Sequence, residues 1–147
     1  MTSLLLLNGP NLNMLGTREP EIYGRVTLAD VEAATTAHAR DAGFDLACFQ
    51  SNHEGALIDA LHEARGKHAG VIFNAGAYTH TSIALHDAIV ASELPVIEVH
   101  ISNVHAREHF RHTSLIAPVT LGQIVGFGTN GYLLAVDALA HHLGSSK

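Results

Sequence analysis

The chain has 147 residues, of which 47% are hydrophobic and 15% charged, a composition typical of one globular domain rather than of a disordered segment. Its net charge of −6, with only 8 lysines and arginines, argues against nucleic acid as a partner, because phosphate binding needs a basic surface. Cys48 is the only cysteine, so no internal disulfide or cysteine cluster for a metal can form. Its apolar surroundings predict a buried, inert thiol.

The hydrophobic pattern predicts five buried strands that alternate with helices. The expected strands are residues 3–7, 44–49, 70–73, 96–99 and 124–127, and the expected helices are residues 28–42, 54–65, 81–91 and 130–143. This alternation predicts an α/β fold of the flavodoxin-like type: a three-layer sandwich with a five-stranded parallel sheet in the order 2-1-3-4-5 and helices on both faces. We expect one domain over residues 1–147, with a short flexible tail at 144–147.

Residues 4–7 are four leucines, but they lack the basic lead-in and the length of a signal peptide or membrane span. We therefore expect a cytoplasmic protein without a membrane partner. A long loop should follow this strand as far as Val26, and its charged part lies between Gly16 and Gly24. Long loops with glycines at both ends suit a lid, although a plain surface loop is the alternative. Thr27 and Asp30 resemble a capping box at the start of the first long helix.

The strand at 96–99 leads directly into His100. Asn103 is placed to cap a further helix that carries Arg107, Phe110 and Arg111. A histidine at a strand end, followed by free backbone N–H groups at a helix start, offers a proton carrier beside an anion site.

Polar residues follow four of the predicted strands in the same way. Because the carboxyl ends of parallel strands meet at one edge of a sheet, these residues should converge on a ligand site. They are Asn11, Arg18, Tyr23, Asn52, His53, Asn74, His80, His100 and Ser102, joined by Arg107 and Arg111.

The residue types at this edge favour acid–base chemistry. Lys67 precedes the third strand, at the opposite edge of the sheet, and Lys147 is terminal, so no lysine is placed to form a Schiff base. No serine lies in a Gly-x-Ser-x-Gly motif. A tyrosine becomes a useful base only when its pKa falls from about 10, which a nearby guanidinium favours. Arg18 and Tyr23 share one loop, although Tyr23 alone could equally pack that loop against the body.

Two further patterns are not taken as cofactor or metal sites. Gly126, Gly128 and Gly131 match a dinucleotide fingerprint, but the chain ends before the required acidic residue on a following strand, so we interpret them as a tight strand-to-helix turn. His105, His109 and His112 have metal-ligand spacing but lack a completing carboxylate or cysteine. We interpret these histidines as a solvated or subunit-contacting face.

Five motifs resemble those of the type II 3-dehydroquinate dehydratases in order and spacing. They are residues 8–13 (NGPNLN), 18–24 (REPEIYG), 50–55 (QSNHEG), 74–82 (NAGAYTHTS) and 98–103 (EVHISN). The resemblance covers nearly the whole chain. It implies a lyase of the shikimate pathway, or of quinate breakdown, that removes water from 3-dehydroquinate through an enolate, without a cofactor or metal.

The resemblance also implies roles for individual residues. Tyr23 would be the base, Arg18 would lower its pKa, and His100 would be the acid that protonates the departing hydroxyl. Asn11 would hold a water or the enolate oxygen, and Glu98 would orient His100. The residues implied in substrate binding are Asn74, the Ile101 amide and Ser102 at the carboxylate, His80 and Arg111 at the ring hydroxyls, and Asp87 at a neighbouring subunit's site.

Members of this family assemble as dodecamers of four trimers, so the resemblance implies a homo-oligomer of that kind. The chain departs from the family pattern at Thr113, Leu115 and Asn130, which affects packing or subunit contacts rather than the reaction. Two other functions remain possible from the sequence: a flavodoxin-like module that binds FMN or another nucleotide, and a catalytically silent structural homo-oligomer.

Overall fold

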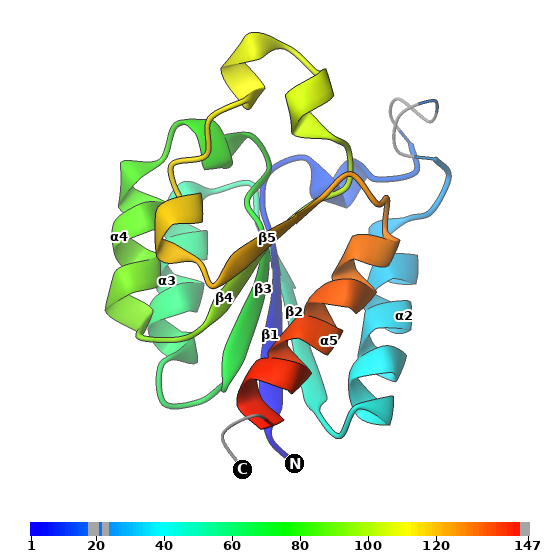
Figure 1. Cartoon of the computed structure of the whole chain (residues 1–147), viewed down its shortest axis with the longest axis vertical. Helices are drawn as coiled ribbons and strands as arrows, with labels where there is room; N and C mark the ends of the chain where they lie inside the picture. The colour runs from blue at the N-terminus through cyan, green and yellow to red at the C-terminus, as the bar shows by residue number, and fades with distance from the viewer. Residues whose placement is uncertain (18–20, 22–23, 145–147) are drawn as a thin grey trace.

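Five parallel strands form one sheet in the part of the chain that the computed structural model describes, residues 1–17, 21 and 24–144 (Figure 1). The strands lie in the order β2-β1-β3-β4-β5, as the sequence predicted. They are β1 (Ser3–Asn8), β2 (Asp45–Gln50), β3 (Gly70–Asn74), β4 (Val96–His100) and β5 (Gly122–Val125). Both ends of the described chain lie at the lower edge in Figure 1, so the carboxyl ends of the strands meet at the upper edge.

Helices cover both faces of the sheet, which confirms the predicted three layers. On one face lie α2 (Leu28–Asp41) and α5 (Asn130–Gly144), and on the other α3 (Glu54–Ala64) and α4 (Ile83–Ser92) (Figure 1). Since successive side chains of a strand point to opposite faces, β1 contributes to two separate cores. Leu4 and Leu6 pack with α2 and α5, and Leu5 and Leu7 pack with α3 and α4.

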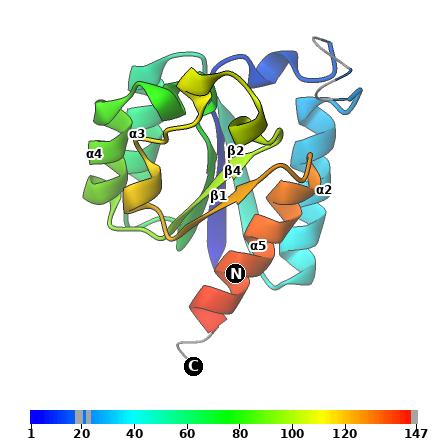
Figure 2. The ribbon, with the colours of Figure 1, turned by 45° about the horizontal axis from the view of Figure 1, so that its top comes forward.

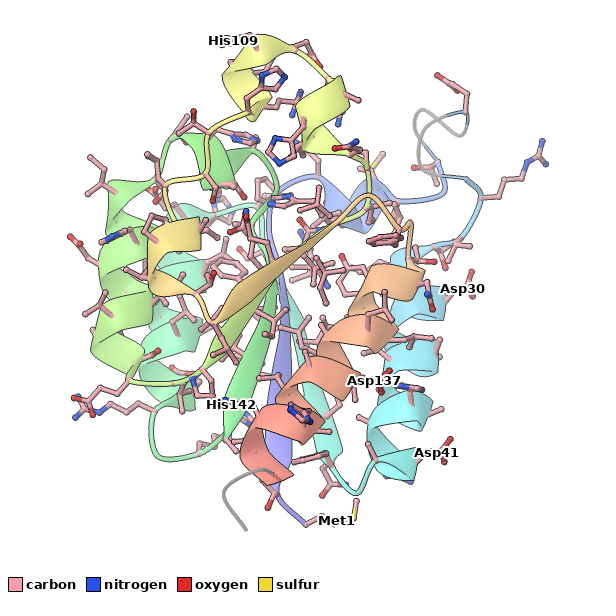
Figure 3. The ribbon with its side chains drawn as sticks, viewed as in Figure 1. Met1, Asp30, Asp41, His109, Asp137 and His142 are labelled. Carbon is pink, nitrogen blue, oxygen red and sulfur yellow. The ribbon has the colours of Figure 1, made fainter. Side chains whose placement is uncertain are left out.

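The start of α2 has the capping box that the sequence predicted. The Asp30 backbone N–H donates to the Thr27 hydroxyl (3.1 Å), and the Thr27 backbone N–H donates to the Asp30 carboxylate (3.0 Å). The bond from the Thr27 N–H to the carboxylate is the main cause that lowers the pKa of Asp30, and the Thr27 side chain adds to the shift. Further along the helix, the His38 imidazole lies 2.7 Å from Asp137 on α5, which joins the two helices of this face (Figure 3).

Removal of this cap should destabilise the protein measurably. We expect Thr27→Ala to lower the free energy of unfolding by about 1 kcal/mol, because the Asp30 N–H loses its acceptor. Urea unfolding followed by circular dichroism measures the change. Thr27→Ser keeps the hydroxyl and should retain most of the stability. An equal loss in both variants would contradict the capping explanation.

Two expectations, the helix after Asn103 and the bounds of the fifth strand, are wrong. The helix expected after Asn103 is two short 3-10 turns, η3 (Val104–Ala106) and η4 (His109–Arg111), separated by extended backbone at Arg107. Asn103 does cap η3, by accepting the His105 N–H (3.1 Å), but Phe110 is 63% exposed, so the segment has no apolar face to hold a longer helix. Strand β5 occupies residues 122–125 instead of 124–127, since Gly126 turns the chain with a φ of +92°. A third short turn, η5 (Ala117–Val119), precedes it.

The expectation of a buried Cys48 is also wrong. Its strand, β2, lies at the edge of the sheet, and Cys48 and Phe49 are exposed in this chain. Partial burial of the sulfur nevertheless raises the thiol pKa to about 11, and the nearby Glu32 carboxylate adds to the shift. Gly144, expected in a flexible tail, belongs to α5, and residues 145–147 lie outside the described residues. In the described part of the chain, no helix has the length and apolar character needed to cross a bilayer.

Candidate active site

A cleft opens at the edge of the sheet where the strands end, beneath the η3–η4 segment, which Figure 2 brings to the front. Its volume is about 120 Å³, which corresponds to about four water molecules at their volume in the liquid. Among its described lining residues, the titratable side chains are all basic and none is Asp or Glu. The basic side chains are His80, His100, Arg107 and Arg111. In a chain with a net charge of −6, this cleft is therefore locally suited to an anion.

His100 and Glu98 form a buried pair at the end of β4. They are two residues apart on the strand, so their side chains point to the same face of the sheet, and Glu98 is 0% and His100 4% exposed. His100 Nε2 lies 2.5 Å from a Glu98 carboxylate oxygen, so Nδ1 is the ring nitrogen left for a ligand. The Ser114 hydroxyl contacts the same carboxylate at 3.0 and 3.1 Å. A carboxylate held in this way can stabilise a protonated imidazole, which makes His100 a candidate general acid.

His80 lies beside His100, with ring centroids 6.4 Å apart and planes inclined by 19°. It belongs to the turn η2 (Gly76–His80) after β3. Its Nδ1 donates to the Thr113 carbonyl (2.8 Å), which leaves Nε2 for other partners. Because this bond uses the backbone of residue 113, the unusual threonine there does not alter it. The Leu115 N–H likewise donates to the Thr79 carbonyl (2.8 Å), so this departure also affects no main-chain contact.

Asn74 is held by a buried chain of hydrogen bonds that reaches α5. Its Nδ2 donates to the Tyr132 hydroxyl (2.9 Å), which donates to Asn8 Oδ1 (2.6 Å), and its Oδ1 accepts the Gly76 N–H (3.1 Å). Burial strongly raises the pKa of the Tyr132 phenol, so the hydroxyl remains a donor. These hydrogen bonds fix the orientation of the Asn74 side-chain amide, with Nδ2 toward Tyr132 and Oδ1 toward Gly76. The second hydrogen of Nδ2 remains for a ligand in the cleft.

Loss of the Tyr132 hydroxyl should affect both stability and binding. We expect Tyr132→Phe to reduce the free energy of unfolding by about 1–3 kcal/mol, because two buried amide groups lose their partner. We also expect a higher KM than in the wild type, since the Asn74 amide is then free to rotate. Urea unfolding and steady-state kinetics measure the two effects. Unchanged stability would contradict the role of this hydroxyl in the buried chain.

Asn11 lies in the loop after β1 with left-handed backbone (φ 69°). Its N–H donates to Asn52 Oδ1 (2.9 Å), which ties the loop to the end of β2. Gly9 lets this loop pass close to β3, because a Cβ there would lie 2.6 Å from the Ala75 carbonyl oxygen. The close approach places Asn11 in the wall of the cleft.

Arg107 lines the cleft beside Ser102 and donates to its hydroxyl (3.3 Å). The sequence placed Arg107 at this edge of the sheet, and the structure confirms that position, but no role was assigned to it. Arg111 also lines the cleft and lies 3.2 Å from Glu108, whose pKa is lowered by a backbone hydrogen bond and by both arginines. Ser114 and Tyr132, which hold Glu98 and Asn74, were missed, because nothing in the local sequence connects them with those residues.

The cleft brings together most of the predicted site residues. Asn11, Asn74, His80, His100, Ile101, Ser102 and Arg111 line it, with Glu98 directly behind His100. Asp87 does not line it: its side chain is exposed on α4 and lies 3.2 Å from His86. Arg18 and Tyr23 lie outside the described residues.

The three histidines with metal-ligand spacing, His105, His109 and His112, lie in the η3–η4 segment or directly after it. The ring centroid of His112 lies 6.3 Å from that of His105 and 5.2 Å from that of His109. His109 is labelled at the top of Figure 3. Over residues 1–17, 21 and 24–144, no group of three His, Cys, Asp or Glu side chains is arranged to hold a metal ion. The predicted glycine turn is confirmed, with Gly128 at a φ of +63° and Gly131 packed against Val99.

Comparison with known proteins finds a family and a set of similar chains. The family model described as dehydroquinase class II matches residues 2–140. A 3-dehydroquinate dehydratase of Ruegeria pomeroyi is 67% identical over 143 residues, covering 97% of this chain and 96% of that protein. One of Jannaschia sp. is 64% identical over 138 residues, covering 94% and 93%. The crystal structure of a type II dehydroquinase from Propionibacterium acnes matches with a TM-score of 0.92 at 42% identity, covering 95% of this chain and 97% of that one.

Proposed function

Because the chain belongs to the class II dehydroquinase family, and so to the 3-dehydroquinate dehydratase class of enzymes, we propose that it converts 3-dehydroquinate to 3-dehydroshikimate by acid–base catalysis through an enolate. The single observation that carries this proposal is the cleft at the sheet edge. Its basic lining suits a substrate carboxylate, and the buried Glu98–His100 pair supplies an acid beside it.

His100 acts as the general acid in this proposal. Glu98 accepts a hydrogen bond from His100 Nε2, so the proton that is transferred sits on Nδ1 of this cleft-lining residue. The proton goes to the departing tertiary hydroxyl, which leaves as water while the enolate electrons form the new carbon–carbon double bond. Glu98 stabilises the imidazolium before transfer and holds the ring in one orientation.

Tyr23 acts as the base and removes the proton from the carbon beside the ketone. Arg18 favours the tyrosinate by its positive charge. This assignment rests on the family resemblance of residues 18–24. Asn11, in the cleft wall, holds a water or the enolate oxygen as the charge develops.

The remaining cleft residues bind the substrate. Asn74, the Ile101 amide and Ser102 hold the carboxylate, and His80 and Arg111 hold ring hydroxyls. Asp87, exposed on α4, reaches the site of a neighbouring subunit in a dodecamer of four trimers. The enzyme functions in the cytoplasm, in the shikimate pathway or in quinate breakdown.

The test is the ultraviolet absorbance of the product. 3-Dehydroshikimate is a conjugated enone carboxylate, so its formation from 3-dehydroquinate is directly visible. We expect turnover at neutral pH that sodium borohydride does not abolish, because no imine forms. Folded protein without turnover would contradict the proposal. Bound nucleotide or flavin in that protein would favour the binding-module alternative.

A further inference from the structure

Ser114 lies behind the Glu98–His100 pair, between β4 and the turn η5. We propose that Ser114 is a positioning residue that keeps the shared proton of this pair on His100, so that the acid is charged before the substrate arrives. The inference deepens the proposed function and rests on it for the identity of the acid. It gives a role to a side chain that touches no ligand: Ser114 lines the space behind the pair and does not line the cleft.

The hydrogen bonds of the Ser114 hydroxyl determine its direction. The backbone N–H groups of Ile116 and Ala117 both point at Ser114 Oγ, at 3.3 and 3.0 Å. A hydroxyl has two acceptor sites and a single hydrogen, so these two donors leave that hydrogen to be donated to Glu98. Glu98 consequently receives donors from both sides, the Ser114 O–H and the His100 Nε2–H.

Such an arrangement favours the ionised form of Glu98. The pair can share its proton in two ways: a carboxylate beside an imidazolium, or a neutral carboxyl group beside a neutral imidazole. A hydrogen bond to a charged oxygen is stronger than one to a neutral oxygen, so the Ser114 hydroxyl stabilises the first state. The effect is large here because Glu98 is fully buried and little water competes for the carboxylate.

Other charged groups also face the pair. Those on the neighbouring turns are His80 on η2, His105 on η3, Arg107 between η3 and η4, Arg111 on η4, and His112 after it. The two arginines oppose a positive charge on His100. The hydrogen bond from Ser114 acts against this opposition at the carboxylate itself.

The test compares Ser114→Ala with the wild type in two measurements. We expect kcat to fall by about 10- to 100-fold, the usual range for loss of a hydrogen bond to a charged group. We also expect the alkaline limb of the kcat–pH profile to move to higher pH, because the deprotonated pair, a Glu98 carboxylate beside a neutral imidazole, loses the same hydrogen bond and therefore takes up its proton more readily. Nitrogen NMR of histidine-labelled protein without substrate should show the same upward displacement for His100 and, below it, a ring that is less protonated than in the wild type. The His100 signals are assigned by their absence in His100→Ala.

Ser82 provides a matched control elsewhere in the fold. Its hydroxyl also donates to a glutamate, Glu54, and also accepts a backbone N–H, that of Leu85, but it does not line the cleft. Ser82→Ala should lower stability and leave the pH profile in place. Ser114→Thr, which keeps the hydroxyl, should restore the wild-type profile.

Several results would overturn the proposal. One is an unmoved His100 titration in folded Ser114→Ala, and another is an equal displacement in Ser82→Ala. If Ser114→Ala does not fold, Ser114→Cys replaces it, since the thiol is a weaker donor of similar size. An unmoved titration in that variant also overturns the proposal. The NMR measurement needs no turnover, so wild-type protein without activity would contradict the dehydratase function but leave this result interpretable.

Discussion

We expect His100→Ala to lower kcat for 3-dehydroquinate by about 100- to 10,000-fold, the range that a positioned general acid supplies. The departing hydroxyl is a poor leaving group unless a proton reaches it as the bond breaks. His100 lines the cleft and is held for this transfer by Glu98 at 2.5 Å, which leaves Nδ1 free of that bond. The initial rate of ultraviolet absorbance increase at saturating substrate measures the change.

His109→Ala is the control for this prediction. It removes the same side chain from the exposed tip of η4, which does not line the cleft (Figure 3). This variant should keep wild-type kcat and KM. If His100→Ala retained more than about a tenth of the wild-type kcat, the acid role would be wrong, since such a loss is smaller than general acid catalysis explains.

The parts of the fold that depend on local pattern could be predicted from the sequence. Residues 4–7 are four consecutive leucines, and a strand buried on both faces needs an apolar residue at each position. The spacing of Thr27 and Asp30 predicts the capping box at the start of α2. Gly126 and Gly128 indicated a turn because glycine adopts positive φ angles readily. Both have a positive φ in the structure, where the chain turns after β5.

The parts that depend on distant neighbours could not be predicted in the same way. Cys48 lies in an apolar run that is typical of a buried strand, but the sheet order places that strand at the edge. The residues after Asn103 have a good cap and helix-compatible spacing, but Phe110 remains mostly exposed, so its burial does not stabilise a longer helix. In both places the position of the segment in the fold, which the local sequence does not specify, decided the outcome.

The candidate site shows the same division. Strand ends identify the residues that face the cleft, because a parallel sheet must bring them to one edge. The residues behind them come from elsewhere in the chain: Tyr132 is 58 residues from Asn74, and Ser114 is 16 residues from Glu98. Sequence spacing carries no sign of such contacts, so the supporting hydrogen bonds required the structure.

The second large effect is expected at Tyr23, where Tyr23→Phe should lower kcat by about 100- to 10,000-fold while the fold is unchanged. Phenylalanine keeps the ring but cannot remove the proton beside the ketone. Absorbance kinetics measure the loss, and circular dichroism checks the fold. Because the base acts before the hydroxyl leaves, Tyr23→Phe should also stop exchange of that proton with deuterated solvent. His100→Ala should retain some of this exchange.

Tyr78→Phe is the matched control, since it removes a phenol that donates to the Asn52 carbonyl (2.7 Å) outside the cleft lining. Its kcat should stay near that of the wild type. Exchange that continues at the wild-type rate in Tyr23→Phe would show that another group removes the proton. Tyr23 would then retain only the role that its sequence context left open, a ring that packs its loop against the body of the protein.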